Sequence, residues 1–235
     1  MTLPIAILAG GLATRLRPLT ERVPKALLDI AGKPFIERQL QLLRRYEAKR
    51  VVLCLGHLGE MIEASLGDGS RWGLDLRYVY DGERLLGTGG ALRRALPFLG
   101  EKFLVLYGDS YLQCDYTAVE RAFVSSGRLG LMTVFRNANR WDRSNVLFVR
   151  DQIVRYDKKS PTTDMMYIDY GLGAFQAKVF DPYLADTPID LATIYQDLVA
   201  QGQLAGFEAA ERFYEVGSPA GLEETRRYFQ TEERQ

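Results

Sequence analysis

The chain has 235 residues, of which 47% are hydrophobic, so it is long enough to bury one full core or a core with a small appendage. Its 30 Lys and Arg residues balance 30 Asp and Glu residues, and this balance gives no electrostatic reason to expect nucleic acid or an anionic membrane surface as a partner. A single histidine, His57, and two distant cysteines, Cys54 and Cys114, exclude a zinc site, a disulfide framework and a Cys-His or Ser-His nucleophile.

The sequence contains no targeting or membrane segment that we can recognise. No stretch of eighteen apolar residues occurs, and the short apolar run near the start has neither a basic start nor a small-residue cleavage site. We therefore expect a cytoplasmic protein with no membrane partner. Without repeats or linker-like composition, residues 1–235 are expected to form a single domain, and a homo-oligomer is left open.

The first half of the chain alternates buried strands with amphipathic helices. Periodicity predicts strands at residues 3–9, 51–55, 74–80 and 103–107 and helices at residues 35–47 and 58–66. Right-handed crossovers between such strands build a mostly parallel sheet with helices on both faces. In sheets of this kind ligands bind where strands end, so the loops after Ala9, Tyr80 and Tyr107 are the expected site.

The second half is richer in strands and predicts a small mixed β extension of the sheet. Strands are expected at residues 129–135, 146–150, 153–156 and 166–176, and helices at residues 190–200 and 218–229. Two of these strands are joined tightly at Asp151 as a hairpin. Ser218 and Pro219 are expected to form the N-cap and the first turn of the last helix.

The loop after the first strand has the composition of a phosphate site. Gly10 and Gly11 let the backbone come close to a phosphate, Arg15 offers a planar donor fork, and Lys25 adds a point charge placed by Pro24. The P-loop pattern is absent, and the nearest dinucleotide-type pattern has Trp72 where its third glycine belongs. A triphosphate is the ligand that these cations favour.

The string LAGGLATRLRPLT, followed by VPKALLDIAGKP, resembles the signature of the sugar-phosphate nucleotidyltransferase family. That signature reads LAGGxGTRLxPLT, then a PK pair, then GxP, and Ala13 stands at its usual second glycine. The resemblance implies a Rossmann-like α/β fold, with a nucleotide-binding part at about residues 1–125 and a sugar-phosphate-binding part at about residues 126–235. It also implies transfer of a nucleotidyl group to a sugar 1-phosphate with release of pyrophosphate. Arg15 and Lys25 would be the catalytic residues, on the outer and the reacting phosphates.

A carboxylate follows the fourth predicted strand, in LVLYGDSY. Asp109 lies where a carboxylate can hold Mg²⁺ against phosphate oxygens. The family resemblance implies the same role, and it implies a second metal ligand in a late motif where this chain has Glu215, in FYEVGSP. Mg²⁺ is therefore the expected cofactor, bound by Asp109 and Glu215.

The acceptor phosphate needs a cation of its own. Lys158 and Lys159 stand where the family carries an EKP-like motif, and Lys159 aligns best. In MYIDYGLG, Asp169 and Gly171 stand where relatives carry Asn or Thr followed by Gly, so Asp169 is expected to contact a sugar hydroxyl. The implied sugar-phosphate-binding set is Lys158, Lys159, Asp169 and Gly171.

The segment ERLLGTGGALRRAL resembles the family's LGTxGAL segment, whose small residues pass beside the base and ribose. GTGGA in particular resembles guanylyltransferases acting on heptose or mannose 1-phosphate, and a nearby carboxylate such as Asp81 or Glu83 can accept from guanine N–H groups. GTP is therefore favoured, while uridylyl, thymidylyl and cytidylyl transfer stay open. The implied nucleotide-binding set is Leu8, Gly10, Gly11, Thr14, Arg15, Asp81, Gly87, Thr88 and Gly89.

Three other classes share parts of this pattern. A glycosyltransferase that consumes a sugar nucleotide normally carries an Asp-x-Asp pair, but Ser110 and Tyr111 follow Asp109. A catalytically silent regulatory subunit fits the departures Ala13 and Glu215 but not the intact cations. A cytidylyltransferase for phosphocholine or another alcohol phosphate would differ only in its acceptor pocket.

Overall fold

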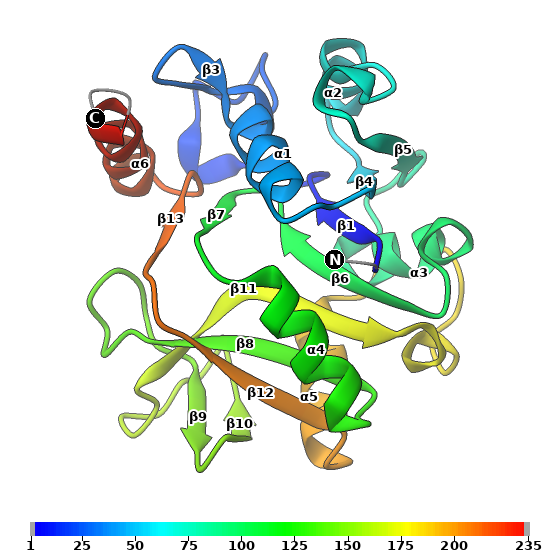
Figure 1. Ribbon diagram of the computed structural model, residues 1–235, viewed down its shortest axis with the longest axis vertical. Helices are drawn as coiled ribbons and strands as arrows, with labels where there is room; N and C mark the ends of the chain where they lie inside the picture. Colours follow the sequence, from blue (N-terminus) through cyan, green and yellow to red (C-terminus); the bar gives the residue numbers. More distant parts are fainter. Residues whose placement is uncertain (1–2, 233–235) are drawn as a thin grey trace.

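The structure, a computed structural model, describes residues 3–232 (Figure 1). Within this range nine strands form one continuous sheet. Across the sheet the strands follow the order β5 (Asp75–Tyr80), β4 (Arg50–Leu55), β1 (Ile5–Leu8), β6 (Lys102–Tyr107), β11 (Tyr167–Gln176), β8 (Gly130–Arg136), β12 (Leu204–Ala209), β10 (Gln152–Tyr156) and β9 (Val146–Val149).

The direction of the strands changes halfway across this sheet. β5, β4, β1 and β6 run parallel to one another. Beyond them β11 is antiparallel to both β6 and β8, β12 is parallel to β8, and β9 and β10 form an antiparallel hairpin. The sheet is therefore parallel in its N-terminal part and mixed in its extension, as the sequence predicts.

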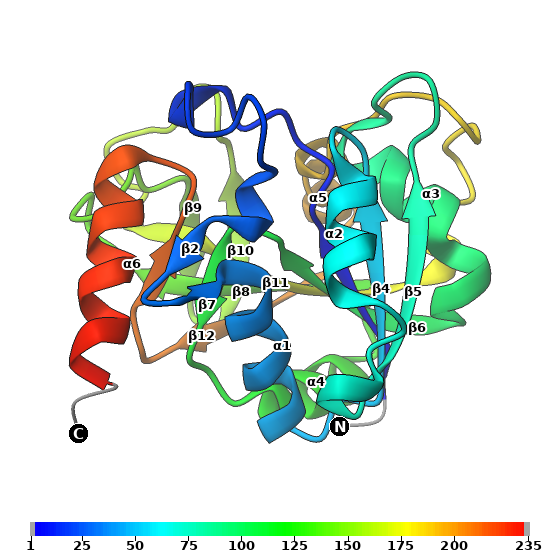
Figure 2. The same ribbon diagram turned by 90° about the horizontal axis from the view of Figure 1, so that it is seen from above.

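Helices cover both faces of the sheet (Figures 1 and 2). One apolar core contains buried side chains of α1 (Phe35–Arg45), α2 (Gly59–Leu66), α4 (Tyr116–Ser126) and α6 (Pro219–Glu232). The other contains those of α3 (Gly87–Leu99) and α5 (Leu191–Ala200). Successive strand residues point to opposite faces, so Ile5 and Ile7 enter the first core and Ala6 the second. Burial on both faces explains why the central strands are continuous apolar runs.

Short elements outside the main sheet shape the site. The turns are η1 (Thr14–Leu16), η2 (Lys25–Leu27), η3 (Ser70–Trp72) and η4 (Ala177–Phe180), and β2 (Asp29–Ile30) pairs with β3 (Lys33–Pro34). β7 (Ser110–Leu112) pairs with β13 (Phe213–Glu215), so that Glu215 lies opposite Ser110. This pairing brings a late segment of the chain beside the end of β6.

The expected elements are present, with ends shifted by at most three residues. The hairpin at Asp151 is confirmed, and Ser218 caps α6 because its hydroxyl accepts from the Gly221 N–H at 3.0 Å. α4 and β12 are elements that the sequence did not predict. β12 contains Gly206, whose Cβ would lie 2.4 Å from the Phe148 ring, so packing rather than strand propensity selects this residue. Among residues 3–232 no helix is long and apolar enough to cross a membrane.

Candidate active site

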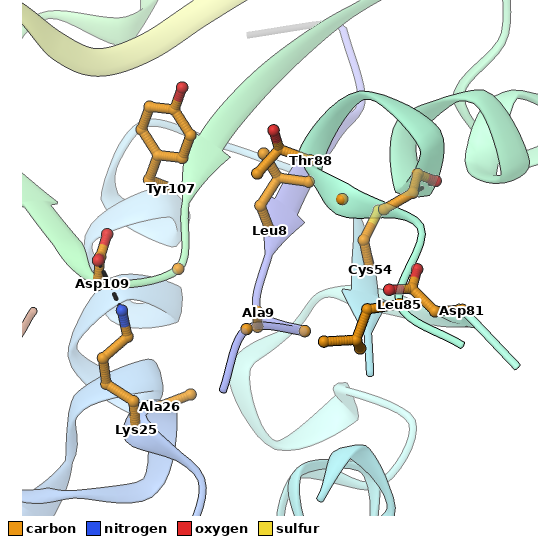
Figure 3. A pocket seen from close by; sticks show the side chains of 15 residues that line it. Leu8, Ala9, Lys25, Ala26, Cys54, Asp81, Leu85, Thr88, Tyr107 and Asp109 are labelled. Atoms are coloured by element: carbon orange, nitrogen blue, oxygen red, sulfur yellow. Dashed lines mark hydrogen bonds and ion pairs between the residues drawn. The ribbon is translucent and has the colours of Figure 1, made fainter. Parts of the chain in front are cut away.

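A pocket of about 220 Å³ opens where β1, β5 and β6 end (Figure 3). The residues that follow these strands, Ala9, Asp81 and Gly108, are all part of its wall, as the sequence predicts. Figure 3 shows Lys25 and Asp109 on one side of the pocket and Asp81 with Leu85 on the other. Its other lining residues are Leu8, Gly10, Gly11, Ala26, Cys54, Gly87, Thr88, Ala91 and Tyr107.

In the glycine loop, Gly10 packs against a neighbouring loop, whereas Gly11 borders open space. A Cβ on Gly10 would lie 2.8 Å from the Gly56 backbone nitrogen, so this glycine permits contact between two loops. A Cβ on Gly11 would meet nothing within 4 Å. Ala13, at the family's second glycine position, has a φ of 48°, a left-handed conformation that glycine adopts at less cost. Thr14, which we expected to bind nucleotide, does not line the pocket.

Lys25 and Asp109 form an ion pair at the inner end of the pocket. The Lys25 Nζ atom lies 2.6 Å from Asp109 Oδ2 (Figure 3). Burial alone would raise the pKa of Asp109, but Lys25 and the Ser110 hydroxyl outweigh it and hold this pKa below its usual value. Pro24 precedes η2 with φ of −64° and directs Lys25 into the site.

Arg15, Asp109 and Glu215 meet around Gly217. A Cβ on Gly217 would lie 2.7 Å from Glu215 Oε2, 3.0 Å from Arg15 Nη2 and 3.1 Å from Asp109 Oδ2. Glu215 also accepts from the Gly217 N–H and, at 2.6 Å, from the Ser218 hydroxyl. The two carboxylates expected to be metal ligands and Arg15, expected to be a catalytic cation, are therefore neighbours, although Glu215 also supports the start of α6.

Replacing Gly217 by alanine should disturb this convergence. The new methyl group would crowd the carboxylate of Glu215, and small displacements of catalytic groups cost large factors in rate. We expect Gly217→Ala to lower kcat by roughly tenfold or more, measured as pyrophosphate release. The shorter carboxylate in Gly217→Ala/Glu215→Asp should restore part of the rate. A normal kcat for the single variant would show that this contact is unimportant.

A second pocket, of about 430 Å³, lies on the other side of Asp109. It shares Tyr107 and Asp109 with the first pocket and also includes Arg15. The rest of its wall comes mainly from the mixed extension: Ser110, Asp142, Arg143, Asn145, Lys158, Ile168, Asp169, Tyr170, Gly171, Phe213 and Glu215. Two adjoining pockets that meet at one carboxylate can place two ligands in contact.

Lys158 rather than Lys159 lies in this second pocket. Its ammonium lies 3.5 Å from Asp169 Oδ2 and 4.9 Å from the centre of the Tyr107 ring. Lys159 is exposed and does not line the pocket, although the family alignment favoured it. The chain turns at this point, because the backbone N–H of Lys159 donates to the Asp157 carboxylate at 3.0 Å. This turn separates Lys159 from the pocket that Lys158 lines.

The side chain of Asp169 is only 3% exposed and already has several partners. Its Oδ2 accepts from Tyr156 at 3.0 Å and from Tyr107 at 3.5 Å, and its Oδ1 accepts from the Gly171 N–H at 3.1 Å. Both tyrosines have a raised pKa because of burial and the charge of Asp169, so they are donors at neutral pH. Asp169 therefore anchors Lys158 and Tyr107, a role that the sequence did not indicate.

The small residues at the start of α3 leave room for the segment around Ile189 as well as for the pocket. A Cβ on Gly87 would lie 2.7 Å from the carbonyl oxygen of Ile189, and a Cβ on Gly89 would lie 2.9 Å from the Ile189 side chain. Gly89 is buried under this segment and does not line the pocket. The Thr88 hydroxyl lines it but also accepts from the Leu191 N–H at 2.8 Å. The expected room for a flat ligand at Gly89 is thus taken by Ile189.

Several pocket residues were not anticipated. Tyr107 stands at the end of β6, so the strand-end rule could have included it. Asn145 and Arg143 follow β8 in a loop without a recognisable motif. Gly217 lines neither pocket but lies beside Asp109, and the sequence indicated no role for it. No group of three or more His, Cys, Asp or Glu side chains in the described part of the chain could hold a metal by itself.

Comparison with known proteins identifies the class. A model of the nucleotidyl transferase family matches residues 5–227. An N-acetylmuramate alpha-1-phosphate uridylyltransferase of Neisseria meningitidis serogroup B is 31% identical over 93% of this chain and 94% of that protein. The beta catalytic subunit of a mannose-1-phosphate guanylyltransferase from Xenopus tropicalis is 29% identical over 91% of this chain and 61% of that protein.

The fold agrees with this class. The solved structure of an inositol-1-phosphate CTP transferase from T. maritima superposes with a TM-score of 0.79 at 24% identity, covering 97% of this chain and 96% of that one. The chain belongs to the nucleotidyl transferase family and is a sugar-1-phosphate nucleotidyltransferase.

Proposed function

We propose that the chain binds a nucleoside triphosphate in the first pocket and a sugar 1-phosphate in the second, and joins them at Asp109. The observation that carries this assignment is that the two pockets share Tyr107 and Asp109. Lys25 lies at the same junction, so its ammonium can reach the phosphate that is attacked. Pyrophosphate leaves on the side of the glycine loop, while Arg15, which was expected on the nucleotide side, lines the second pocket beside Asp109 and faces the junction from there.

The chemistry needs positioned charge more than proton transfer. A phosphate monoester has a second pKa of about 6, so the acceptor is mostly a dianion at neutral pH and attacks without a general base. Its oxygen forms the new bond to the α-phosphorus while the bond to pyrophosphate breaks. Lys25 and Arg15 stabilise the charge that develops on the α-phosphate and on the leaving group. Neither pocket wall includes a histidine, which is consistent with this reaction.

Asp109 and Glu215 suit a magnesium ion. Hard oxygen donors are the ligands that Mg²⁺ prefers, and it is commonly bound by one or two carboxylates together with substrate phosphates. Asp109 already holds a cation, the ammonium of Lys25, and Glu215 Oε2 lies close to the same position. When bound, Mg²⁺ would neutralise phosphate charge; Asp109 and Glu215 would hold it.

On the acceptor side, Lys158 is the proposed partner of the sugar 1-phosphate. Its ammonium is oriented by Asp169 and the Tyr107 ring, which lies at the boundary between the pockets. Asn145 donates no side-chain N–H to any described residue, while its carbonyl oxygen accepts from the Asp169 N–H at 2.9 Å. The free amide hydrogens of Asn145 can therefore donate to sugar hydroxyls.

We favour guanine as the base because of the position of Asp81 in the first pocket. Asp81 is 7% exposed and lines the first pocket, and its Oδ2 accepts from the Leu86 N–H at 3.1 Å. Burial raises the pKa of Asp81, so its carboxylate gains from further N–H donors. Guanine presents two such donors on one edge. Uracil presents one N–H between two carbonyl oxygens, which a carboxylate repels.

Asp81→Asn tests this choice. The variant keeps the bond to the Leu86 N–H but replaces one acceptor by a donor, so we expect kcat/KM for GTP to fall by about 10–100-fold, with a smaller effect on UTP. Pyrophosphate release with each nucleotide measures both. Glu83→Gln, an exposed carboxylate in the same loop, serves as the control. An unchanged base preference in Asp81→Asn would count against guanine recognition by this residue.

The favoured acceptor is a heptose or mannose 1-phosphate, and cell-surface polysaccharide synthesis is the use that such a product suggests. A uridylyltransferase for an acidic sugar is the second candidate. The relative of Neisseria meningitidis supports it by covering both chains almost entirely. Muramate carries a carboxylate besides the phosphate, and Arg143 in the second pocket is a suitable partner for that group.

One experiment separates these candidates. Pyrophosphate release is measured with Mg²⁺ for GTP, UTP, CTP, dTTP and ATP against heptose, mannose, glucose, hexosamine and N-acetylmuramate 1-phosphates. Activity confined to GTP with a heptose or mannose would support the first proposal. A preference for UTP with the acidic sugar would establish the second. Silence with every pair would overturn both.

A further inference from the structure

Gln39 is a buried polar residue directly behind the catalytic turn. It lies on α1 and is 1% exposed. Its side-chain nitrogen donates to the carbonyl oxygen of Tyr107 at 3.1 Å and to that of Ser110 at 2.7 Å. These two carbonyls flank Gly108 and Asp109. One amide group thus joins both ends of the four-residue turn that carries the catalytic carboxylate.

The partners determine the orientation of this amide. Both contacts are carbonyl acceptors, so the nitrogen must face the turn; the reversed amide would place oxygen against oxygen. The remaining atom, Gln39 Oε1, is buried and has no partner among the described residues. An unpaired buried acceptor costs free energy. The two bonds that the amide donates offset this cost, so they are the contacts to which we attribute its role.

The other polar groups of the turn are held from different directions. The Gly108 N–H donates to Leu8 of β1 at 3.0 Å, and the Val216 N–H donates to the Asp109 carbonyl oxygen at 2.8 Å. Gln39 supplies the third support, from α1. With the backbone held in this way, the Asp109 carboxylate faces Lys25 and lies near Glu215.

The chain just before α1, including the segment GKPF at residues 32–35, explains how Gln39 reaches the 107–110 turn. Ala31 and Gly32 both have positive φ, 50° and 79°, as a two-residue hairpin turn between β2 and β3 requires. The Phe35 N–H then donates to the Leu28 carbonyl oxygen at 3.0 Å, and α1 begins. Four residues into the helix, Gln39 points toward the end of β6; Figure 1 shows α1 beside β7 and β1.

We propose that Gln39 is a positioning residue for nucleotidyl transfer, because its amide holds the 107–110 turn so that Asp109 meets the metal and the reacting phosphates. The proposal rests on the proposed function of Asp109. Gln39 touches neither substrate itself. Groups that orient metal ligands affect metal affinity and activity by about 10–100-fold, and a similar effect is expected here.

The test compares Gln39→Met, which keeps the volume but donates no hydrogen bond, with the wild type. We expect kcat to fall by about 10–100-fold and Mn²⁺, used as a probe in water proton relaxation with a non-hydrolysable nucleotide, to bind roughly tenfold more weakly. KM for the nucleotide should stay within about threefold, because the phosphate loop is untouched. Gln41→Met, on the same helix but without a bond to the turn, should resemble the wild type.

Gln39→Asn decides the matter if Gln39→Met does not fold. Its amide is one methylene shorter and cannot reach both carbonyls, so an intermediate loss of kcat and Mn²⁺ affinity is expected. Wild-type kcat and Mn²⁺ affinity in the folded variant would overturn the proposal. So would a loss of thermal stability alone, since this would make Gln39 merely structural. If the wild type itself were inactive, the proposed function of the site would be refuted. The contact between Gln39 and the 107–110 turn would be unaffected by that result.

Discussion

Lys25→Ala should lower kcat by on the order of 10²–10³-fold while the enzyme stays folded. Lys25 forms an ion pair with Asp109, where the proposed nucleotide and acceptor pockets meet. Its charge is proposed to act on the phosphate under attack, where negative charge increases most in the transition state. Because no general base is available to compensate, removal of this charge should affect the chemical step directly.

Single-turnover measurements of pyrophosphate release would isolate that step, and nucleotide binding is measured separately by titration. We expect nucleotide binding to weaken less than the rate, because the glycine loop of the first pocket remains. Lys49→Ala, an exposed lysine before β4, is the matched control. A Lys25→Ala variant with a chemical step close to that of the wild type would remove Lys25 from the mechanism.

Asp109→Asn should have an effect of similar size, roughly 10³-fold on kcat, through a different cause. The substitution keeps the shape of the side chain and its contact with Ser110 but removes the negative charge that holds a cation. Addition of Mg²⁺ or Mn²⁺ should therefore increase activity less, and only at higher concentration. Measurement of kcat against metal concentration, with nucleotide binding measured in parallel, tests this expectation.

Asp115→Ala is a control that should lose stability but keep its kcat. Asp115 caps α4 by accepting from the Ala118 N–H at 2.9 Å, and loss of an N-cap costs about 1 kcal/mol of stability. That variant should unfold at lower temperature with unchanged kcat, whereas Asp109→Asn should lose kcat. If both variants lost activity in proportion to stability, Asp109 would have no special role.

The difference in unfolding free energy between the wild type and Asp109→Asn should also depend on pH. The pKa of Asp109 is lower in the folded protein than its ordinary value, so its ionised form stabilises the fold. This contribution is fully present above the unfolded pKa of about 3.9 and is lost as the pH falls through the lower folded value. The difference in unfolding free energy between wild type and Asp109→Asn should therefore shrink in acid. A difference that stays constant from neutral pH to about pH 3 would contradict the assigned shift.

Much of the fold and of the nucleotide pocket can be inferred from local sequence. Buried strands are visible as apolar runs, and the carboxyl ends of parallel strands lie at one edge of a sheet. The positions of the strand ends along the chain therefore suffice to group Ala9, Asp81 and Asp109 in one pocket. The signature around Gly10 and Lys25 adds the chemical class, because glycine turns and cations at such an edge suit phosphate.

The sugar side was less predictable because it depends on side-chain direction. Lys158 and Lys159 are adjacent in sequence, yet only Lys158 lines the pocket, since Asp157 turns the chain at that point. Asp169 was expected to face a hydroxyl, whereas two tyrosines and Lys158 surround it.

Alone, the sequence determined the class of fold, the edge of the sheet where the pocket opens, and the cations proposed to bind phosphate, since these follow from periodicity and one continuous motif. Tertiary structure decided the contacts between distant segments. The β7–β13 pairing brings Glu215 and Gly217 to Asp109, Ile189 fills the space beside Gly89, and α1 places Gln39 behind the catalytic turn. Such contacts arise from packing across the sheet, where no local pattern records which surfaces meet.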